Sequence, residues 1–131
     1  MADFLTAHKL TAINEGGYTD DPKDSGNWYK GKLIGTNKGI SAPVLAGYLK
    51  RMPTVDEMKQ LSDEVALSIY KKNYWDEMWG DKWISQDNAN NVYDMCVNAG
   101  VQTSIKIWQH AIGVPETGKM NTQTLNRTNL S

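Results

Sequence analysis

From Ser41 to the end of the chain, apolar residues recur at helical spacing, and the runs begin at capping residues. Ser41-Ala42-Pro43 places a cap and an early proline before one run, and Thr54-Val55-Asp56-Glu57 fits a capping box before the next. Further helices are predicted from Ser62, over about 88–99, from Thr103, and from Asn121 or Thr122. The pattern indicates an all-α fold.

The N-terminal part combines one more predicted helix with a long loop. Asp3 can cap a helix over residues 3–15, and Gly16-Gly17 ends it, because glycine is favoured just past a helix end. Residues 16–40 have no helical period and are rich in Gly, Asp, Pro, Ser and Asn. We expect a loop there, with a small β-hairpin around Trp28–Ile34 as the one departure from an all-α fold. Loops of this length are usually functional when ordered.

Composition limits the classes of protein to which the chain can belong. The 131 residues predict one domain, and the net charge of -1 gives no indication of a nucleic-acid partner or of binding to an anionic membrane. No apolar stretch approaches the ~20 residues that span a bilayer, so membrane insertion is not expected. Two histidines far apart in the sequence and one cysteine do not make a zinc site, so no metal is expected. The start of the chain has no secretory leader pattern, which predicts synthesis in the cytoplasm.

Acidic residues gather around the loop, at Glu15, Asp20, Asp21 and Asp24. A glycosidase needs one carboxylic acid that protonates the departing oxygen and a second carboxylate that handles water or attacks carbon. Glu15 falls in the last turn of its predicted helix, where the negative end of the helix dipole favours the protonated carboxyl. A glutamate before Gly-Gly is also common in ordinary solvated turns, so position alone does not decide between the two interpretations.

Residues 15–26 (EGGYTDDPKDSG) and 36–41 (TNKGIS) resemble the signature of glycoside hydrolase family 108, a lysozyme-like family of phage and bacterial muramidases that includes endolysins and secretion activators. Residues 70–76 (YKKNYWD) are similar to that family's Tyr-Trp helix. Residues 92–125, with VNAG at 97–100 and WQHAIG at 108–113, resemble the peptidoglycan-binding segment that follows it. The resemblance implies one lysozyme-like domain over 1–131, with a catalytic portion at 1–84 and a peptidoglycan-binding-like helical portion at 85–131.

The chain departs from the family pattern in the loop. Asn27 stands where the family's motif has the second glycine of a Gly-Gly pair. Residues 28–35 are inserted before Thr36. We expect this loop tip to carry a specificity of its own.

The resemblance also implies roles for individual residues. Glu15 corresponds to the general acid, Asp24 to the residue that orients the attacking water or stabilises the transition state, and Thr36 to a residue that helps to position the water. Asp21 competes with Asp24 as the second carboxylate and is otherwise expected to bind substrate or shape the turn before Pro22.

Aromatic and amide side chains complete the expected glycan-binding set. Trp28 is the tryptophan expected to touch glycan, because it lies in the loop beside the acid, and Tyr18 and Asn98 are expected to line the substrate site. Three groups are instead expected to be core: the remaining tryptophans at 75, 79, 83 and 108, His8, and the lone Cys96.

The predicted function is hydrolysis of the β-1,4 bond between N-acetylmuramic acid and N-acetylglucosamine in peptidoglycan, by a monomer and without a cofactor. A wall hydrolase made without a secretory leader is expected to reach the cell wall through a holin or a secretion system. A chitinase-like hydrolase, a non-catalytic peptidoglycan-binding module, and a wall remodeller associated with secretion are the alternatives. Solubilisation of purified walls, and the activity of Glu15→Gln, separate these alternatives.

Overall fold

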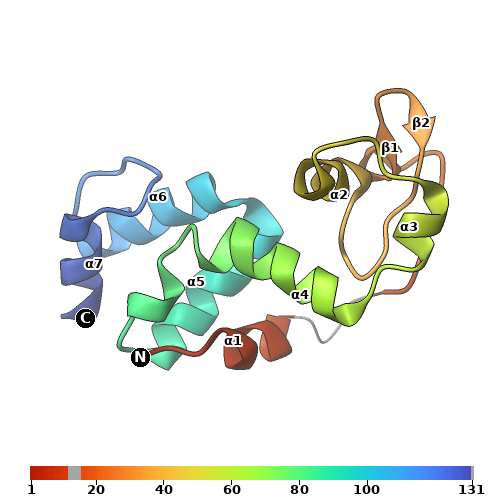
Figure 1. Ribbon diagram of the computed structural model, residues 1–131. Helices are drawn as coiled ribbons and strands as arrows, with labels where there is room; N and C mark the ends of the chain where they lie inside the picture. Colours follow the sequence, from red (N-terminus) through yellow and green to blue (C-terminus); the bar gives the residue numbers. More distant parts are fainter. Residues whose placement is uncertain (12–15, 131) are drawn as a thin grey trace. The chain divides into compact units, whose positions relative to one another are not determined.

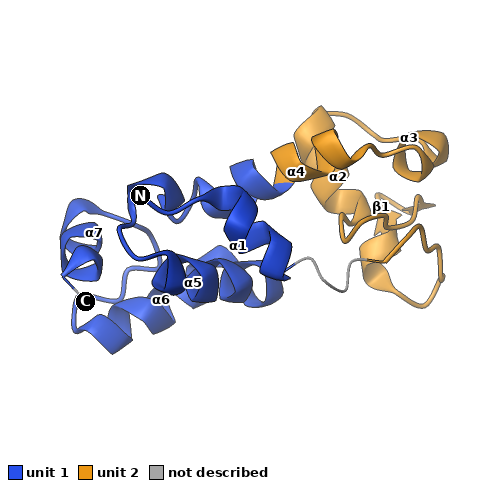
Figure 2. Cartoon of the chain, turned by 90° about the horizontal axis from the view of Figure 1, so that it is seen from below, with its two compact units in different colours: residues 1–13, 70–131 blue, residues 14–69 orange. Residues whose placement is uncertain are grey.

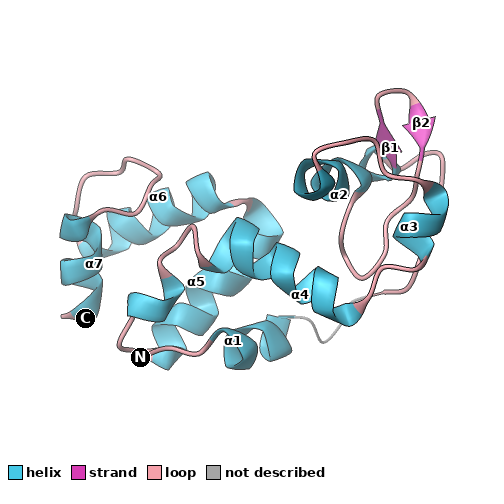
Figure 3. Ribbon diagram, in the orientation of Figure 1, coloured by secondary structure: helices cyan, strands magenta, loops and turns pink. Residues whose placement is uncertain are grey.

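The computed structural model describes residues 1–11 and 16–130, and they form seven α-helices and one two-stranded antiparallel sheet (Figure 1). Helix therefore dominates, and the hairpin is the only sheet within the described residues (Figure 3). The mainly α fold class with a small hairpin is confirmed. In chain order the elements are α1 Phe4–Thr11, β1 Trp28–Tyr29, β2 Lys32–Leu33, α2 Ala42–Leu49, α3 Val55–Lys59, α4 Asp63–Tyr70, α5 Gln86–Ala99, α6 Val101–Ile112 and α7 Thr122–Asn129.

Residues 1–13 and 70–131 form one compact unit, and residues 14–69 form a second (Figure 2). In the first unit α1 packs on α5, α5 on α6, and α6 on α7. Its core is strongly aromatic: the Phe4 and Tyr93 rings meet edge to face, and Trp83 stacks on Trp108 with ring centroids 5.5 Å apart. Such pairs add stability beyond the area that they bury.

In the second unit the loop, the hairpin and α2–α4 surround a smaller apolar core. Ile40, Leu45, Met58 and Ile69 are all essentially excluded from solvent. Asn37 ties the loop to α3, because its side-chain Nδ2 donates hydrogen bonds to the carbonyl oxygens of Met58 at 2.9 Å and Lys59 at 3.2 Å. The loop is therefore held against a helix as well as by its own turns.

Several predicted helix starts are confirmed by their hydrogen bonds. Asp3 accepts from the backbone N–H of Thr6, and Thr54 and Glu57 form the complete capping box of α3. Ser62 accepts from the N–H of Val65, and Asn121 caps α7. Ser41 occupies the N-cap position of α2, although its side chain makes no capping hydrogen bond.

Two details differ from the sequence prediction. α6 begins at Val101 rather than at a cap on Thr103, because Gly100, with φ at +90°, both ends α5 and starts α6. The tryptophans at four-residue steps do not lie on one regular helix. Trp75 ends a π-helical turn (Lys71–Trp75), Trp79 adopts a left-handed backbone, and Trp83 follows a 3₁₀ turn (Gly80–Lys82).

Candidate active-site loop

The loop that follows position 15 is closed by backbone pairing between its two ends. Thr19 and Thr36 exchange both N–H···O hydrogen bonds, each 2.8 Å long. Between them the chain forms the 3₁₀ turn Ser25–Asn27 and the predicted hairpin, in which Trp28 pairs with Leu33 and Tyr29 with Lys32. Lys30 and Gly31 at its tip both have positive φ, as the tight turn of a two-residue hairpin requires.

Asn27 is the centre of the hydrogen bonds inside this loop, and it is fully buried. Its Nδ2 donates to the Asp21 carbonyl oxygen at 2.9 Å, and its Oδ1 accepts the hydroxyl hydrogen of Thr36 at 2.6 Å. Its own N–H donates to the Asp24 carbonyl at 3.1 Å, and its carbonyl accepts from the N–H groups of Ile34 and Gly35. In the sequence, the only indication of the importance of Asn27 is that it replaces a glycine of the family pattern.

The two competing carboxylates have the same local role. Asp21 Oδ1 accepts from the N–H of Lys23 at 3.0 Å, and Asp24 Oδ1 accepts from the N–H of Gly26 at 2.9 Å. Each of these is the side-chain turn that aspartate forms with the backbone two residues later. Both residues are exposed, so both carboxylates are accessible to a ligand.

Tyr18 directly precedes Thr19, the partner of Thr36, and its ring lies against Gly35. The Tyr18 hydroxyl donates to the Ile34 carbonyl at 2.8 Å, and the Lys59 ammonium lies 5.4 Å from the centre of the Tyr18 ring. Burial, together with the Asp20 carboxylate, raises the pKa of Tyr18 above its ordinary value, so the phenol stays protonated at neutral pH. The protonated Tyr18 hydroxyl can therefore keep donating to the Ile34 carbonyl, which holds the ring in place as one side of the loop surface.

Trp28 is exposed and held in a fixed orientation. Its side chain is 37% accessible, and its Nε1 donates to the Pro22 carbonyl at 2.9 Å. The indole N–H is thus already bonded, and the exposed part of the ring is an apolar surface at the base of the hairpin. Such a surface suits stacking against a sugar ring.

Two of the predicted site residues, Glu15 and Asn98, are not found in the described part of this loop. Glu15 lies outside the described residues, so its predicted role stays a prediction. Asn98 belongs to the first compact unit, near the end of α5, where its Nδ2 donates to the Asp94 carbonyl at 2.8 Å. The structure brings together Tyr18, Asp21, Asp24, Trp28 and Thr36.

Most of the residues predicted to be core are buried, but Trp79 and Trp108 are only half-buried. His8 is buried, and its Nδ1 lies 2.8 Å from the Tyr93 hydroxyl; burial lowers the pKa of His8. Burial also raises the pKa of the Cys96 thiol to about 11, so this cysteine is not an activated nucleophile at neutral pH. Trp75 and Trp83 are fully buried.

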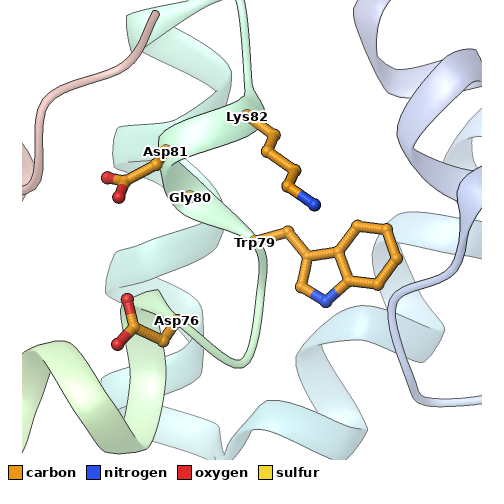
Figure 4. Close-up of a pocket in the computed structure, with 5 residues that line it drawn as sticks. All are labelled: Asp76, Trp79, Gly80, Asp81 and Lys82. Carbon is orange, nitrogen blue, oxygen red and sulfur yellow. The ribbon is translucent and has the colours of Figure 1, made fainter.

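A surface pocket of about 240 Å³ lies in the first unit, lined by Asp76, Trp79, Gly80, Asp81 and Lys82 (Figure 4). The Lys82 ammonium covers the Trp79 ring at 4.7 Å, while the Asp76 and Asp81 carboxylates extend away from that ring. Both carboxylates instead face the Lys71 ammonium, which lies 2.9 Å from Asp76 Oδ1 and 4.0 Å from Asp81 Oδ2. None of the predicted site residues takes part in this pocket.

Within residues 1–11 and 16–130, no three His, Cys, Asp or Glu side chains gather in a way that could hold a metal ion. Over the same residues, no helix combines the length and the apolar character needed to cross a membrane.

Comparison with known proteins identifies the family. The model of the family described as Glycosyl hydrolase 108 matches residues 8–100, which includes the whole loop. No curated protein sequence matches the chain. Among solved structures, SagA from Brucella abortus is similar, with a TM-score of 0.80 and 30% sequence identity over 98% of this chain and 69% of the SagA chain. The chain belongs to glycosyl hydrolase family 108, and it is a glycoside hydrolase whose family implies a peptidoglycan substrate.

Proposed function

We propose that this enzyme cleaves the β-1,4 bond between N-acetylmuramic acid and N-acetylglucosamine in the bacterial cell wall, with Glu15 as the general acid. Membership of family 108 supports a glycan substrate. The observation that carries the proposal is the organisation of the loop directly after Glu15. Asp24 and Thr36, which the family resemblance pairs with that acid, are both hydrogen-bonded to the buried Asn27.

The proposed chemistry requires no cofactor. Glu15 gives its proton to the departing glycosidic oxygen, and Asp24 accepts a proton from the water that attacks the anomeric carbon. Asp24 is suited to this task because only its Oδ1 is used by the turn to Gly26. Asp21, whose Oδ1 is used in the same way by Lys23, is the competing candidate.

The remaining loop residues are assigned to substrate binding. Trp28 offers the exposed part of its ring to a sugar, and Tyr18 forms a rigid wall through its bond to the Ile34 carbonyl. The hairpin that carries Trp28 is inserted relative to the family pattern, so we assign it a role in selecting the glycan. We also propose that Asn98 contributes a substrate contact and that the enzyme acts as a monomer.

Identification of the new reducing ends tests the bond that is cut. Purified cell walls are digested with the full chain, the products are reduced with borohydride, and the terminal sugars are identified by mass spectrometry. Reduced N-acetylmuramic acid at the new ends is the expected result. Reduced N-acetylglucosamine would show that the other glycosidic bond is cut, and would contradict the proposal.

Two parallel measurements address the alternatives. Chitin oligosaccharides are incubated with the same preparation, and cleavage of chitin at a higher kcat/KM than peptidoglycan would favour the chitinase-like alternative. Sedimentation of the protein with walls that release no new reducing ends would indicate a binding module instead of an enzyme acting on this substrate.

A further inference from the structure

The orientation of the Asn27 side-chain amide is determined by its neighbours. A carbonyl oxygen can only accept hydrogen bonds, so the group that faces the Asp21 carbonyl must be the Nδ2 donor. Oδ1 therefore faces Thr36, 2.6 Å from its Oγ1. The reversed amide would bring two oxygens together in a fully buried position, where an unsatisfied polar group is costly.

This arrangement fixes the direction of the hydrogen bond made by Thr36. A hydroxyl has one hydrogen, and that of Thr36 is donated to Asn27. The backbone of Thr36 is held at the same time by both hydrogen bonds to Thr19. Towards a ligand or a water, Thr36 Oγ1 can therefore only accept.

An acceptor suits a hydrolytic water better than a donor does. The water attacks through one of its two oxygen lone pairs, and two acceptors that hold its two hydrogens fix the direction of those lone pairs and raise the electron density on the oxygen. A hydroxyl that donated to the water would instead use one lone pair and make the oxygen less nucleophilic. One acceptor is a carboxylate, and a second group that only accepts completes the pair.

We propose that Asn27 is a positioning residue, which holds the Thr36 hydroxyl as an acceptor for the attacking water. This inference rests on the proposed function, in which Asp24 is the other acceptor. In the step concerned, the water oxygen bonds to the anomeric carbon and the bond from that carbon to the departing oxygen breaks. The departing oxygen takes the proton of Glu15, and a water proton passes to Asp24. Asn27 and Thr36 exchange no proton.

Competition between water and methanol tests the proposal. Methanol has one hydroxyl hydrogen, so it can satisfy only one of the two acceptors, and a site with both acceptors in place favours water. The full chain is incubated with soluble peptidoglycan glycan fragments in dilute methanol, and mass spectrometry gives the ratio of methyl glycoside to free reducing sugar. This ratio does not depend on the fraction of enzyme that is folded.

The informative variants are Asn27→Ala and Thr36→Val, and Asn37→Ala is the matched control. Asn37 is also a buried asparagine of this loop, but its Nδ2 donates to carbonyl oxygens of α3, whereas the Thr36 hydroxyl is bonded to Asn27. We expect the methanol ratio to rise several-fold in Asn27→Ala and Thr36→Val. We also expect kcat to fall on the order of a hundredfold in both, with KM changed little, because a misplaced reactant costs about that factor. Asn37→Ala should lower stability and leave the ratio unchanged.

A further variant keeps the inference testable if Asn27→Ala does not fold. Thr36→Ser retains the hydroxyl and should keep the wild-type ratio. An unchanged ratio in Thr36→Val, or in a folded Asn27→Ala with reduced kcat, contradicts the inference. A raised ratio in Thr36→Ser contradicts it as well. A wild-type enzyme that cleaves no peptidoglycan would instead contradict the proposed function.

Discussion

The ring of Tyr18 lies so close to Gly35 that a β-carbon at position 35 would be 2.6 Å from three of its atoms, Cε1, Cζ and the hydroxyl oxygen. Gly35 also has φ at +101°, a conformation that other residues rarely adopt. Any side chain at this position must therefore displace the tyrosine that closes the loop onto the Ile34 carbonyl.

Gly35→Ala is expected to lower the free energy of unfolding by about 2–3 kcal/mol, because it combines a steric clash with backbone strain. Gly31→Ala is the control. Position 31 also has a positive φ, at +78°, but its β-carbon would meet nothing within 4 Å. Urea unfolding should give a smaller loss for Gly31→Ala, and equal losses would show that Tyr18 moves aside without cost.

Gly80→Ala is expected to destabilise the first unit by about 3 kcal/mol. The new β-carbon would lie 2.1 Å from Cε2 of the fully buried Trp75, whose Nε1 donates to Asp81 Oδ1 at 2.8 Å. Gly47→Ala should act in the opposite direction. Gly47 is an exposed residue of α2 with open space around its β-carbon position, so alanine should stabilise by about 0.5–1 kcal/mol through helix propensity. Thermal unfolding of both variants checks the pair, and a stable Gly80→Ala would contradict the packing at Trp75.

Glu57 should make stability depend on acid pH. The side-chain hydrogen bond from Arg51 and the backbone N–H of Thr54 lower the pKa of Glu57 from 4.5 to about 2. The unfolded chain binds this proton more readily, so the stabilisation is fully present above about pH 4.5 and is lost as pH falls towards 2.

Glu57→Gln, which can still accept from Thr54, isolates the contribution of the charge. Its melting temperature should lie below that of the wild type at neutral pH, and the difference should shrink as the pH falls from about 4.5 to about 2. High salt should reduce the difference at neutral pH, because the ion pair is exposed. A difference that is constant across this pH range would contradict the assignment.

Much of the fold could be predicted from the sequence because the relevant information is local. The capping box at Thr54, the cap at Asn121 and the hairpin around Trp28–Ile34 each depend on residues within a few positions of one another. The start of α6 was predicted wrongly because Gly100 ends one helix and begins the next, whereas Thr103 matched a capping pattern that the chain does not use.

Less of the candidate site than of the fold could be predicted from the sequence. The chemistry-bearing residues Asp21, Asp24 and Thr36 are visible as a motif, but the residue that joins them is not. Asn27 resembles any asparagine in a turn-rich loop, and its importance depends on burial and on a partner at position 36 beyond the hairpin. Pairing at that distance in the sequence leaves no periodic pattern.

Substitution of the two competing carboxylates should identify the one that handles water. Asp24→Asn and Asp21→Asn both remove a charge while keeping an oxygen that can accept from Gly26 and Lys23, so the turns should survive. We expect kcat to fall on the order of a hundredfold or more in Asp24→Asn, and only a few-fold in Asp21→Asn. Steady-state release of reducing ends measures both, and the reverse order would assign the role to Asp21.

Glu15→Gln tests the central claim most directly. Wild type and variant are compared on purified cell walls by the rate at which new reducing ends appear, with circular dichroism as the check on folding. Glu77→Gln, which changes an exposed glutamate of the first unit, is the control. The account predicts a folded Glu15→Gln whose rate is lower by on the order of 10²–10⁴-fold, as expected when a general acid is lost, and a wild-type rate for Glu77→Gln. A folded Glu15→Gln that cleaves walls at the wild-type rate would contradict it.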